Sequence, residues 1–261
     1  MIGIFDSGVG GMTVAQAVEQ ALPDFRLVYF GDLARAPYGS KSPETITRYA
    51  RQNTDFLLAH GAKLIIIACN SAASVASDLL KNTYDVPMFE VITPAIHSAS
   101  KASASSRIGV IGTRATIKSG VYEEKIRQLL PEARVHSQAC PLLVPLVEEG
   151  WLNKRETKMI VRRYLHHLRL KQVDTLVLGC THYPLLKHLI QPRIGKAVKV
   201  IDSSAAVAAE LRLFLENSPE FAQSLARDGE NVYYVSDVTD AALSTAQRIF
   251  GRRIDLRKAT F

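Results

Sequence analysis

The chain has 261 residues, of which 47% are hydrophobic and 22% are charged, and its formal net charge is +7. At about 150 residues per domain, this length predicts one large domain or two modest ones. The ordinary composition excludes a disordered, collagenous or disulfide-rich protein. The strongest apolar run begins at Leu64 and meets Asn70, well short of the ~18 residues of a membrane helix. We therefore expect a globular protein with no membrane association.

The excess of basic residues, 32 Lys and Arg against 25 Asp and Glu, is spread along the chain, with local clusters at Arg162-Arg163 and from Arg252 to Lys258. Neither an aromatic-interleaved basic motif nor zinc-finger spacing accompanies it, so we interpret it as solvated helix faces and expect no nucleic-acid partner. The opening sequence MIGIFDSG has an acid and no basic leader, which predicts a cytoplasmic protein. In that compartment the three cysteines are expected to be reduced thiols.

Short apolar runs alternate with longer amphipathic stretches from one end of the chain to the other. The predicted strands, in chain order, cover residues 2–5, 27–30, 64–68, 108–112, 175–179 and 198–201. Between residues 153 and 168, Ile160, Val161, Tyr164, Leu165 and Leu168 share one stripe, as in a helix with one buried face. Continuous apolar strands separated by helices predict an α/β protein with parallel sheets covered on both faces.

The two halves of the chain also resemble each other. The first strand leads to Ser7, and Cys69 follows 62 residues later at the end of another strand. The strand at 108–112 leads to Thr113, and Cys180 follows 67 residues later in the same setting. We interpret this as a degenerate duplication, with a domain boundary near the Ser-rich stretch at 98–106.

The two repeated cysteines carry the clearest chemical signal. Cys69-Asn70-Ser71 and Cys180-Thr181-His182 both follow predicted strands directly, and ligands of open α/β sheets bind at the carboxyl ends of strands. Each cysteine also precedes an expected helix start, where the helix N-terminus can lower the pKa of a thiol. The inferred compartment argues against a disulfide between them. Cys140, in Ala139-Cys140-Pro141, lacks polar neighbours and is expected to be structural.

Thiolates act either as nucleophiles or as proton-transfer bases. A nucleophilic hydrolase needs only one cysteine. Two facing thiols, alternating as base and acid, would remove a proton from one face of a carbon and deliver one to the other. This pair therefore favours inversion of a stereocentre.

Five ordered motifs resemble those of the glutamate racemases: FDSGVGG at 5–11, APYG at 36–39, ACNSA at 68–72, PLVEEG at 145–150 and GCTHYPLL at 179–186. The resemblance implies interconversion of L- and D-glutamate without a cofactor, supplying D-glutamate for peptidoglycan in cell-wall biogenesis. It implies two pseudo-symmetric α/β domains with the active site between them, the chain's end returning to the first. We accordingly expect residues 1–96 plus 206–261 to form one domain and 97–205 the other, and a homodimer.

Site residues follow from the same motifs. The resemblance implies that Cys69 and Cys180 are the catalytic acid/bases, Cys69 acting on D-glutamate and Cys180 on L-glutamate. It implies that Asp6, His182 and Glu148 assist the thiols. The expected substrate-binding residues are Asp6, Ser7, Tyr38, Gly39, Asn70, Ser71, Thr113, Thr181 and His182.

Each assignment has a structural alternative. Asp6 would cap the helix expected near Gly11, His182 would be a packed loop residue, and Asp32 is either a turn residue or a further acid of the site. Glu148 and Glu149 would form a solvated helix end. His166 and His167 lie on a predicted helix without metal-ligand spacing, so no metal site is expected. The DSGVGG loop lacks the GxGxxG spacing of a nucleotide site.

Three other functions stay open at this point. The first is a racemase for aspartate or another acidic amino acid, because the thiols define the reaction better than they define the side-chain pocket. The second is a non-catalytic α/β module that binds a small anion or a nucleic-acid backbone. The third is a Cys-dependent amidase, which would form an acyl-enzyme on one cysteine only.

Overall fold

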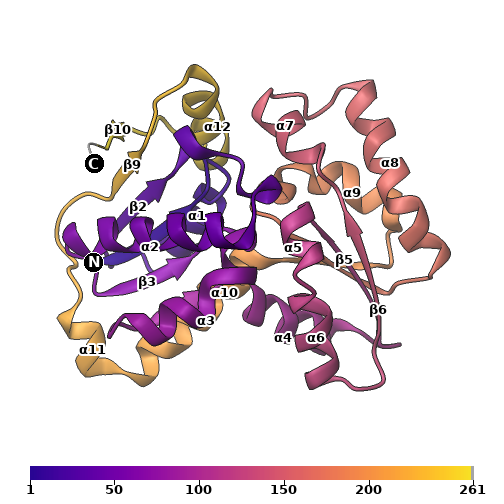
Figure 1. Cartoon of the computed structure of the whole chain (residues 1–261), viewed down its shortest axis with the longest axis horizontal. Helices are drawn as coiled ribbons and strands as arrows, with labels where there is room; N and C mark the ends of the chain where they lie inside the picture. The colour runs from indigo at the N-terminus through magenta and orange to yellow at the C-terminus, as the bar shows by residue number, and fades with distance from the viewer. Residues whose placement is uncertain (260–261) are drawn as a thin grey trace.

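The computed structural model of the chain describes residues 1–259 and contains two parallel β-sheets surrounded by helices (Figure 1). Within that range the first sheet has six strands in the order β10-β9-β2-β1-β3-β4, and the second has four in the order β6-β5-β7-β8. The strands are β1 (Ile2–Asp6), β2 (Leu27–Gly31), β3 (Leu64–Ile67), β4 (Met88–Glu90), β5 (Arg107–Gly112), β6 (Arg134–Ala139), β7 (Thr175–Gly179), β8 (Lys199–Asp202), β9 (Val232–Val235) and β10 (Leu256–Lys258).

The helices between β1 and β6 in chain order are α1 (Met12–Ala21), α2 (Pro43–Ala59), α3 (Asn70–Thr83), α4 (Ile92–Ala102), α5 (Arg114–Lys118) and α6 (Val121–Leu129). The remainder are α7 (Leu143–Glu148), α8 (Arg155–Leu170), α9 (Lys187–Ile194), α10 (Ser203–Asn217), α11 (Pro219–Ser224) and α12 (Asp240–Phe250). Short 3₁₀ helices cover Leu33–Arg35, Tyr38–Ser40 and Tyr183–Leu186. None of the helices in residues 1–259 is long and apolar enough to cross a membrane.

The central strands form because their sequences are continuously apolar and become buried on both faces. All residues of β1, β3 and β7 are buried, as is typical of parallel sheets covered by helices. Strand β1 pairs with both β2 and β3, with Ile2 opposite Leu27 on one side and Leu64 on the other. All six strands expected from the sequence are confirmed, and the α/β fold class with them.

Four strands were not predicted, and three of them lie at sheet edges. Strands β4 and β10 have three residues each, and β6 has the mixed sequence RVHSQA. Edge strands bury less of their surface and need no continuous apolar run, so hydrophobic patterning does not reveal them. The fourth, β9, lies inside its sheet with the apolar sequence VYYV. This run has the pattern of a buried strand, so β9 could have been predicted from the sequence.

Helices α4 and α10 lie where the chain passes between the two sheets. They pack against each other, and α10 also packs against α1. After α10 the chain returns to the first sheet and adds β9 and β10 (Figure 1). The domain boundaries at 96/97 and 205/206 fall inside these two helices and remain a prediction.

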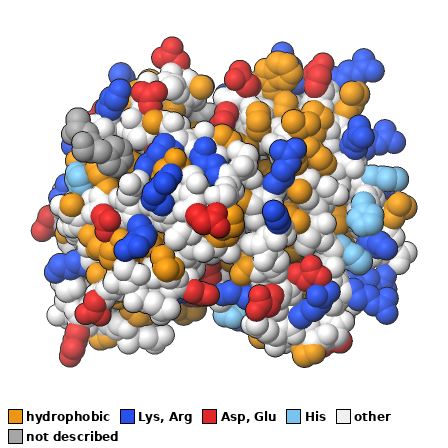
Figure 2. Space-filling model, in the orientation of Figure 1, with side chains coloured by type: hydrophobic (Ala, Val, Ile, Leu, Met, Phe, Trp, Pro, Cys, Tyr) orange, Lys and Arg blue, Asp and Glu red, His pale blue; other side chains and the backbone are white. Residues whose placement is uncertain are grey.

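Helix α8 confirms the amphipathic pattern read from the sequence. Val161, Leu165 and Leu168 are buried, whereas Arg162 and Arg163 are exposed. His166 and His167 are also exposed, and Figure 2 shows His side chains on the outer edge of the molecule over α8. The same view shows Lys and Arg side chains scattered over the face drawn rather than gathered in one patch.

The packing of the second sheet predicts the effect of a truncation in β7. Leu176 has no exposed surface, whereas Leu170, at the end of α8, is 68% exposed. Leu176→Ala should lower the free energy of unfolding by about 2–5 kcal/mol because it leaves a cavity in the core. Leu170→Ala, which removes the same atoms, should change it by less than about 0.5 kcal/mol. Urea unfolding followed by circular dichroism measures both, and equal losses would contradict the packing described.

Candidate active site

Cys69 and Cys180 line a single cavity between the carboxyl ends of the two sheets. The cavity lining consists of Ser7, Ala36, Pro37, Tyr38, Gly39, Cys69, Asn70, Ser71, Thr113, Val144, Glu148, Cys180, Thr181 and His182. Its volume is about 20 Å³, which is room for one or two water molecules. The structure thus brings together, from both halves of the chain, every predicted site residue except Asp6, which lies immediately behind the lining.

The two thiols differ in their surroundings. Cys69 directly precedes α3, as expected, and its thiol donates a hydrogen bond to Ser7 Oγ at 3.5 Å. Cys180 is followed by the 3₁₀ helix Tyr183–Leu186 rather than by an α-helix. Burial and the nearby Asp6 carboxylate raise the pKa of Cys69 to about 12. In this closed cavity burial therefore outweighs the helix N-terminus that was expected to lower it. All three cysteines are free, so the alternative of a disulfide is wrong.

His182 stands between Cys180 and Glu148. Its Nδ1 lies 3.9 Å from Cys180 Sγ, and its Nε2 lies 3.2 Å from Glu148 Oε1 without the alignment of a hydrogen bond. Burial disfavours the charged ring, but the interactions with Cys180 and Glu148 outweigh it and raise the pKa of His182 to about 10. These interactions favour the protonated, positively charged imidazole at neutral pH.

Asp6 occupies the corresponding place beside Cys69. Its buried carboxylate accepts hydrogen bonds from Gly8 N–H at 2.9 Å and from Thr181 Oγ1 at 3.4 Å. Burial raises the pKa of Asp6, opposed mainly by the positive charge of His182. The residue preceding α1 is Gly11, which contributes no side-chain cap. A hydrogen bond from the Gly11 N–H also helps to lower the pKa of Asp6, so the Asp6 carboxylate lies at the N-terminus of α1, as its structural alternative expected, as well as beside Cys69.

Hydroxyl and amide groups from both halves meet at the cavity. Ser71 Oγ and Thr113 Oγ1, which come from α3 and from the loop after β5, lie 2.9 Å apart. The Tyr122 hydroxyl donates to Asn70 Oδ1 at 2.7 Å, while Asn70 Nδ2 is buried and has no hydrogen-bond partner in residues 1–259. An unpaired buried donor is costly unless a ligand satisfies it, which makes this amide a candidate contact for an anionic group.

Two glycines allow the halves to approach this closely. A Cβ atom at Gly10 would lie 2.4 Å from His182 Nδ1, and one at Gly39 would lie 2.5 Å from Thr113 Cβ. Any side chain at either position would push the two sheets apart. Gly10 of the glycine-rich loop is therefore explained by packing between the halves, whereas Gly11 makes room for Asp6 of the same half.

Asp32 supports the site without lining it. Its buried carboxylate accepts hydrogen bonds from Arg35 Nε at 2.6 Å, from Ser236 Oγ at 3.1 Å and from the hydroxyl of Tyr38. Asn53 Nδ2 donates to the same Tyr38 oxygen at 3.0 Å. Asp32 thus holds Tyr38, which does line the cavity.

Some lining residues carry no chemical signal in the sequence. Val144 lies one helical turn before Glu148 on α7, so the two share a face, but an apolar residue in an apolar run is not recognisable as part of a site. Ala36 and Pro37 are joined by a cis peptide bond in the loop before Tyr38. Across residues 1–259, no group of three or more His, Cys, Asp or Glu side chains is placed to hold a metal ion.

The raised pKa of His182 predicts how stability depends on pH. Its pKa is about 10 in the folded protein against 6.5 as the ordinary value, so the charged ring stabilises the fold fully below pH 6.5, and this stabilisation is lost as the pH rises through 10. The loss in free energy of unfolding caused by His182→Asn should be largest at and below pH 6.5 and should shrink towards pH 10. Urea unfolding across this range measures it, and a loss that grows with pH would contradict the assignment.

Comparison with known proteins agrees with this geometry. The family model for Asp/Glu/hydantoin racemases matches residues 12–211. A glutamate racemase of Geobacter metallireducens is 44% identical over 253 residues, covering 97% of this chain and 93% of that protein. Among solved structures, a glutamate racemase isoform from Bacillus anthracis is 34% identical with a TM-score of 0.93, covering 100% of this chain and 97% of the other. A glutamate racemase from Francisella tularensis in complex with D-glutamate is 33% identical with a TM-score of 0.90, covering 99% and 97%. The chain therefore belongs to the Asp/Glu/hydantoin racemase family.

Proposed function

We propose that this protein is a glutamate racemase, which interconverts L- and D-glutamate by a two-base mechanism without a cofactor. The observation that carries the proposal is the position of Cys69 and Cys180, which come from separate sheets and line one cavity. The similarity to glutamate racemases over nearly the whole chain supports glutamate as the substrate.

The proton transfers balance within the two thiols. With D-glutamate, Cys69 first passes its proton to the neighbouring Asp6 carboxylate. The resulting thiolate removes the α-proton, and the electron pair of the C–H bond stays on the carbon as an enolate-like carbanion. The Cys180 thiol then delivers its proton to the opposite face, giving L-glutamate and leaving Cys180 as the thiolate. The enzyme is then ready for the reverse reaction, in which the two cysteines exchange roles.

The surrounding residues assist these transfers. Asp6, beside Cys69, and His182, beside Cys180, are each placed to hold or relay the proton of the neighbouring thiol. Glu148 keeps His182 charged and oriented. The unpaired Asn70 amide and the hydroxyls of Ser71 and Thr113 are suited to bind substrate carboxylates. Exclusion of water from so small a cavity strengthens each of these interactions at the carbanion.

The remaining substrate-binding assignments are Ser7, Tyr38, Gly39 and Thr181, all of which line the cavity. Asp6 was also expected to bind substrate, and its position behind the lining favours the role beside Cys69. In the cell, the reaction would supply D-glutamate for peptidoglycan. We further propose that the enzyme is cytoplasmic and forms a homodimer, as expected from the sequence.

Exchange of the α-proton tests the reaction directly. Purified protein is incubated in deuterated water with L-glutamate or with D-glutamate, and proton NMR is combined with chiral chromatography of the same samples. The α-proton signal should disappear from both isomers, and each should yield the other. Folded, reduced protein that exchanges aspartate but not glutamate would support the alternative substrate class. Exchange of neither, with tight and steeply salt-dependent DNA binding, would support a binding module.

Cysteine substitutions test the two-base assignment. Cys69→Ser and Cys180→Ser should each reduce kcat for racemisation by about 100-fold or more in both directions, because a serine hydroxyl is a far poorer proton-transfer group at neutral pH. Cys140→Ser is the matched control, because the Cys140 thiol lies outside the cavity and a hydroxyl can still donate to the Gln138 carbonyl. Its activity should stay within about two-fold of the wild type. Wild-type rates in both site variants would refute the mechanism.

The small cavity also predicts that the site opens to admit substrate. Cys69 and Cys180 are 4% and 5% exposed, so a thiol reagent should reach them only during opening. Mass spectrometry after timed treatment with iodoacetamide should show labelling of both, and saturating D-glutamate should slow it at least ten-fold. Cys140, with no exposed surface, should label more slowly than either. Rapid labelling that D-glutamate does not affect would contradict the gating of access.

A further inference from the structure

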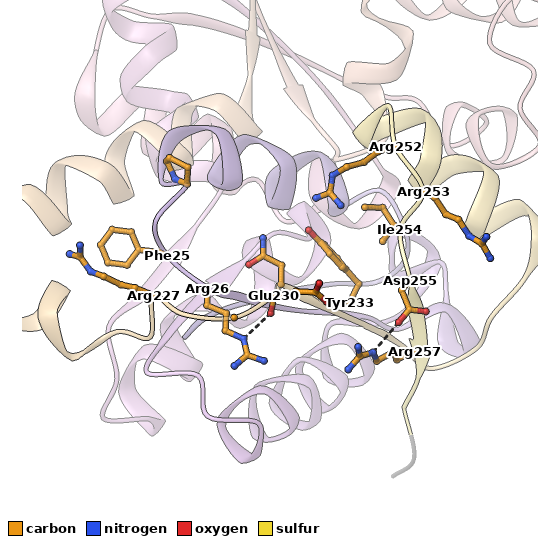
Figure 3. A pocket seen from close by; sticks show the side chains of 13 residues that line it. Phe25, Arg26, Arg227, Glu230, Tyr233, Arg252, Arg253, Ile254, Asp255 and Arg257 are labelled. Atoms are coloured by element: carbon orange, nitrogen blue, oxygen red, sulfur yellow. Dashed lines mark hydrogen bonds and ion pairs between the residues drawn. The ribbon is translucent and has the colours of Figure 1, made fainter.

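A second and larger cavity lies at the opposite end of the first sheet. It has a volume of about 440 Å³, within the range of small-molecule sites. Its walls come from the residues that precede β2, β9 and β10 and from β9 and β10 themselves (Figure 3). Because these strands are parallel, the cavity is at their amino ends, whereas Cys69 and Asp6 are at the carboxyl ends of β3 and β1.

Five arginines line this cavity, which we call the arginine pocket: Arg26, Arg227, Arg252, Arg253 and Arg257. They come from segments far apart in the sequence, so that only folding brings them together. The carboxylates of the lining are those of Glu230 and Asp255. Like charges held this close repel one another, and a concave site lined mainly by one sign of charge attracts the opposite sign.

Internal contacts neutralise only part of this charge. Arg252 pairs with Glu19 at 3.0 Å, and Arg257 pairs with Asp255 at 3.1 Å. Arg26 Nε donates instead to the uncharged carbonyl of Glu230, at 2.8 Å, and Arg227 stacks over the Phe25 ring at 4.7 Å. These two guanidinium groups therefore keep their charge and most of their donors for a ligand.

The arrangement of the side chains fits an extended anion better than a single small one. In Figure 3 the guanidinium groups of Arg26 and Arg257 lie on the same side of the pocket, with Tyr233 between them and Arg252. Arg227 and Arg253 stand at opposite ends. A guanidinium group binds phosphate oxygens with two parallel hydrogen bonds, so several of them spread over one pocket suit linked phosphates.

We propose that the arginine pocket binds a compact oligophosphate, a ligand with at least two linked phosphate groups. The site is separate from the racemase site, since it occupies the other end of the sheet. Binding there neither requires nor competes with an acidic amino acid. Arg26 and Arg257 make the principal contacts, because they lie on the same side of the pocket and the exposed ion pair of Arg257 with Asp255 engages its Nε and leaves its terminal nitrogens to the ligand. The aromatic side chains of the lining leave room for an organic group attached to the phosphates.

Isothermal titration calorimetry with inorganic pyrophosphate tests the proposal at about 150 mM salt, where exposed charges more than ~8 Å apart are largely screened. The wild type should bind with one-to-one stoichiometry, and orthophosphate should bind at least ten-fold more weakly. Arg26→Gln and Arg257→Gln together should weaken pyrophosphate binding at least ten-fold. Arg257→Gln alone, at an exposed strand position, should weaken it measurably and keeps the test valid if the double variant does not fold.

The matched control, Arg162→Gln with Arg163→Gln, removes an equal number of arginine charges from the exposed face of α8. These changes should leave pyrophosphate binding unchanged, and saturating D-glutamate should not displace the bound pyrophosphate.

Adenosine diphosphate separates the two sources of such a ligand. Binding tighter than that of pyrophosphate indicates a nucleotide, and equal binding indicates a free oligophosphate. The proposal is overturned by the absence of pyrophosphate binding at millimolar concentration. It is also overturned if the pocket variants and the α8 variants weaken pyrophosphate binding equally. A third contradicting result is duplex DNA that binds more tightly than pyrophosphate and whose binding the pocket and α8 variants weaken equally.

Discussion

The close approach of two sets of parallel strand ends is the constraint on which the site depends. In each sheet all strands run in the same direction, so the residues that follow them gather at one edge. The two edges meet where Gly10 faces His182 and Gly39 faces Thr113, with no room for a side chain at either glycine. This contact encloses Cys69 and Cys180 together, and it leaves a cavity too small for free exchange of water.

Enclosure sets the electrostatics of the site. Removing Cys69 and Asp6 from water raises the pKa of both and favours their protonated forms. The interactions of His182 with Cys180 and Glu148 act in the other direction and keep the imidazole charged. The two halves thus pair each thiol with a different partner, a carboxyl group on one side and an imidazolium on the other. The two halves of the fold therefore surround their thiols with chemically different groups.

The first sheet uses its two ends differently. Its carboxyl end carries a buried acid and a thiol in a closed cavity, whereas its amino end carries an open pocket lined by arginines. The return of the chain after α10 creates the second feature, because β9 and β10 extend the sheet beside β2 and bring Arg252 to Arg257 next to Arg26. The net charge of the whole chain is only moderately positive, so a local excess of this kind is invisible in the composition.

Local sequence determined the parts of this protein whose signal is local. Apolar runs predicted the central strands, and polar residues directly after them predicted the ends at which Cys69 and Cys180 stand, because buried parallel strands must be continuously apolar. Edge strands such as β6 escaped prediction since they need no such pattern. Only the tertiary structure decided that Val144 lines the cavity, that Asp32 holds Tyr38 and that the pKa of Cys69 is raised rather than lowered. Each of these depends on contacts between distant segments and on the exclusion of water, which neighbouring residues in a sequence do not determine.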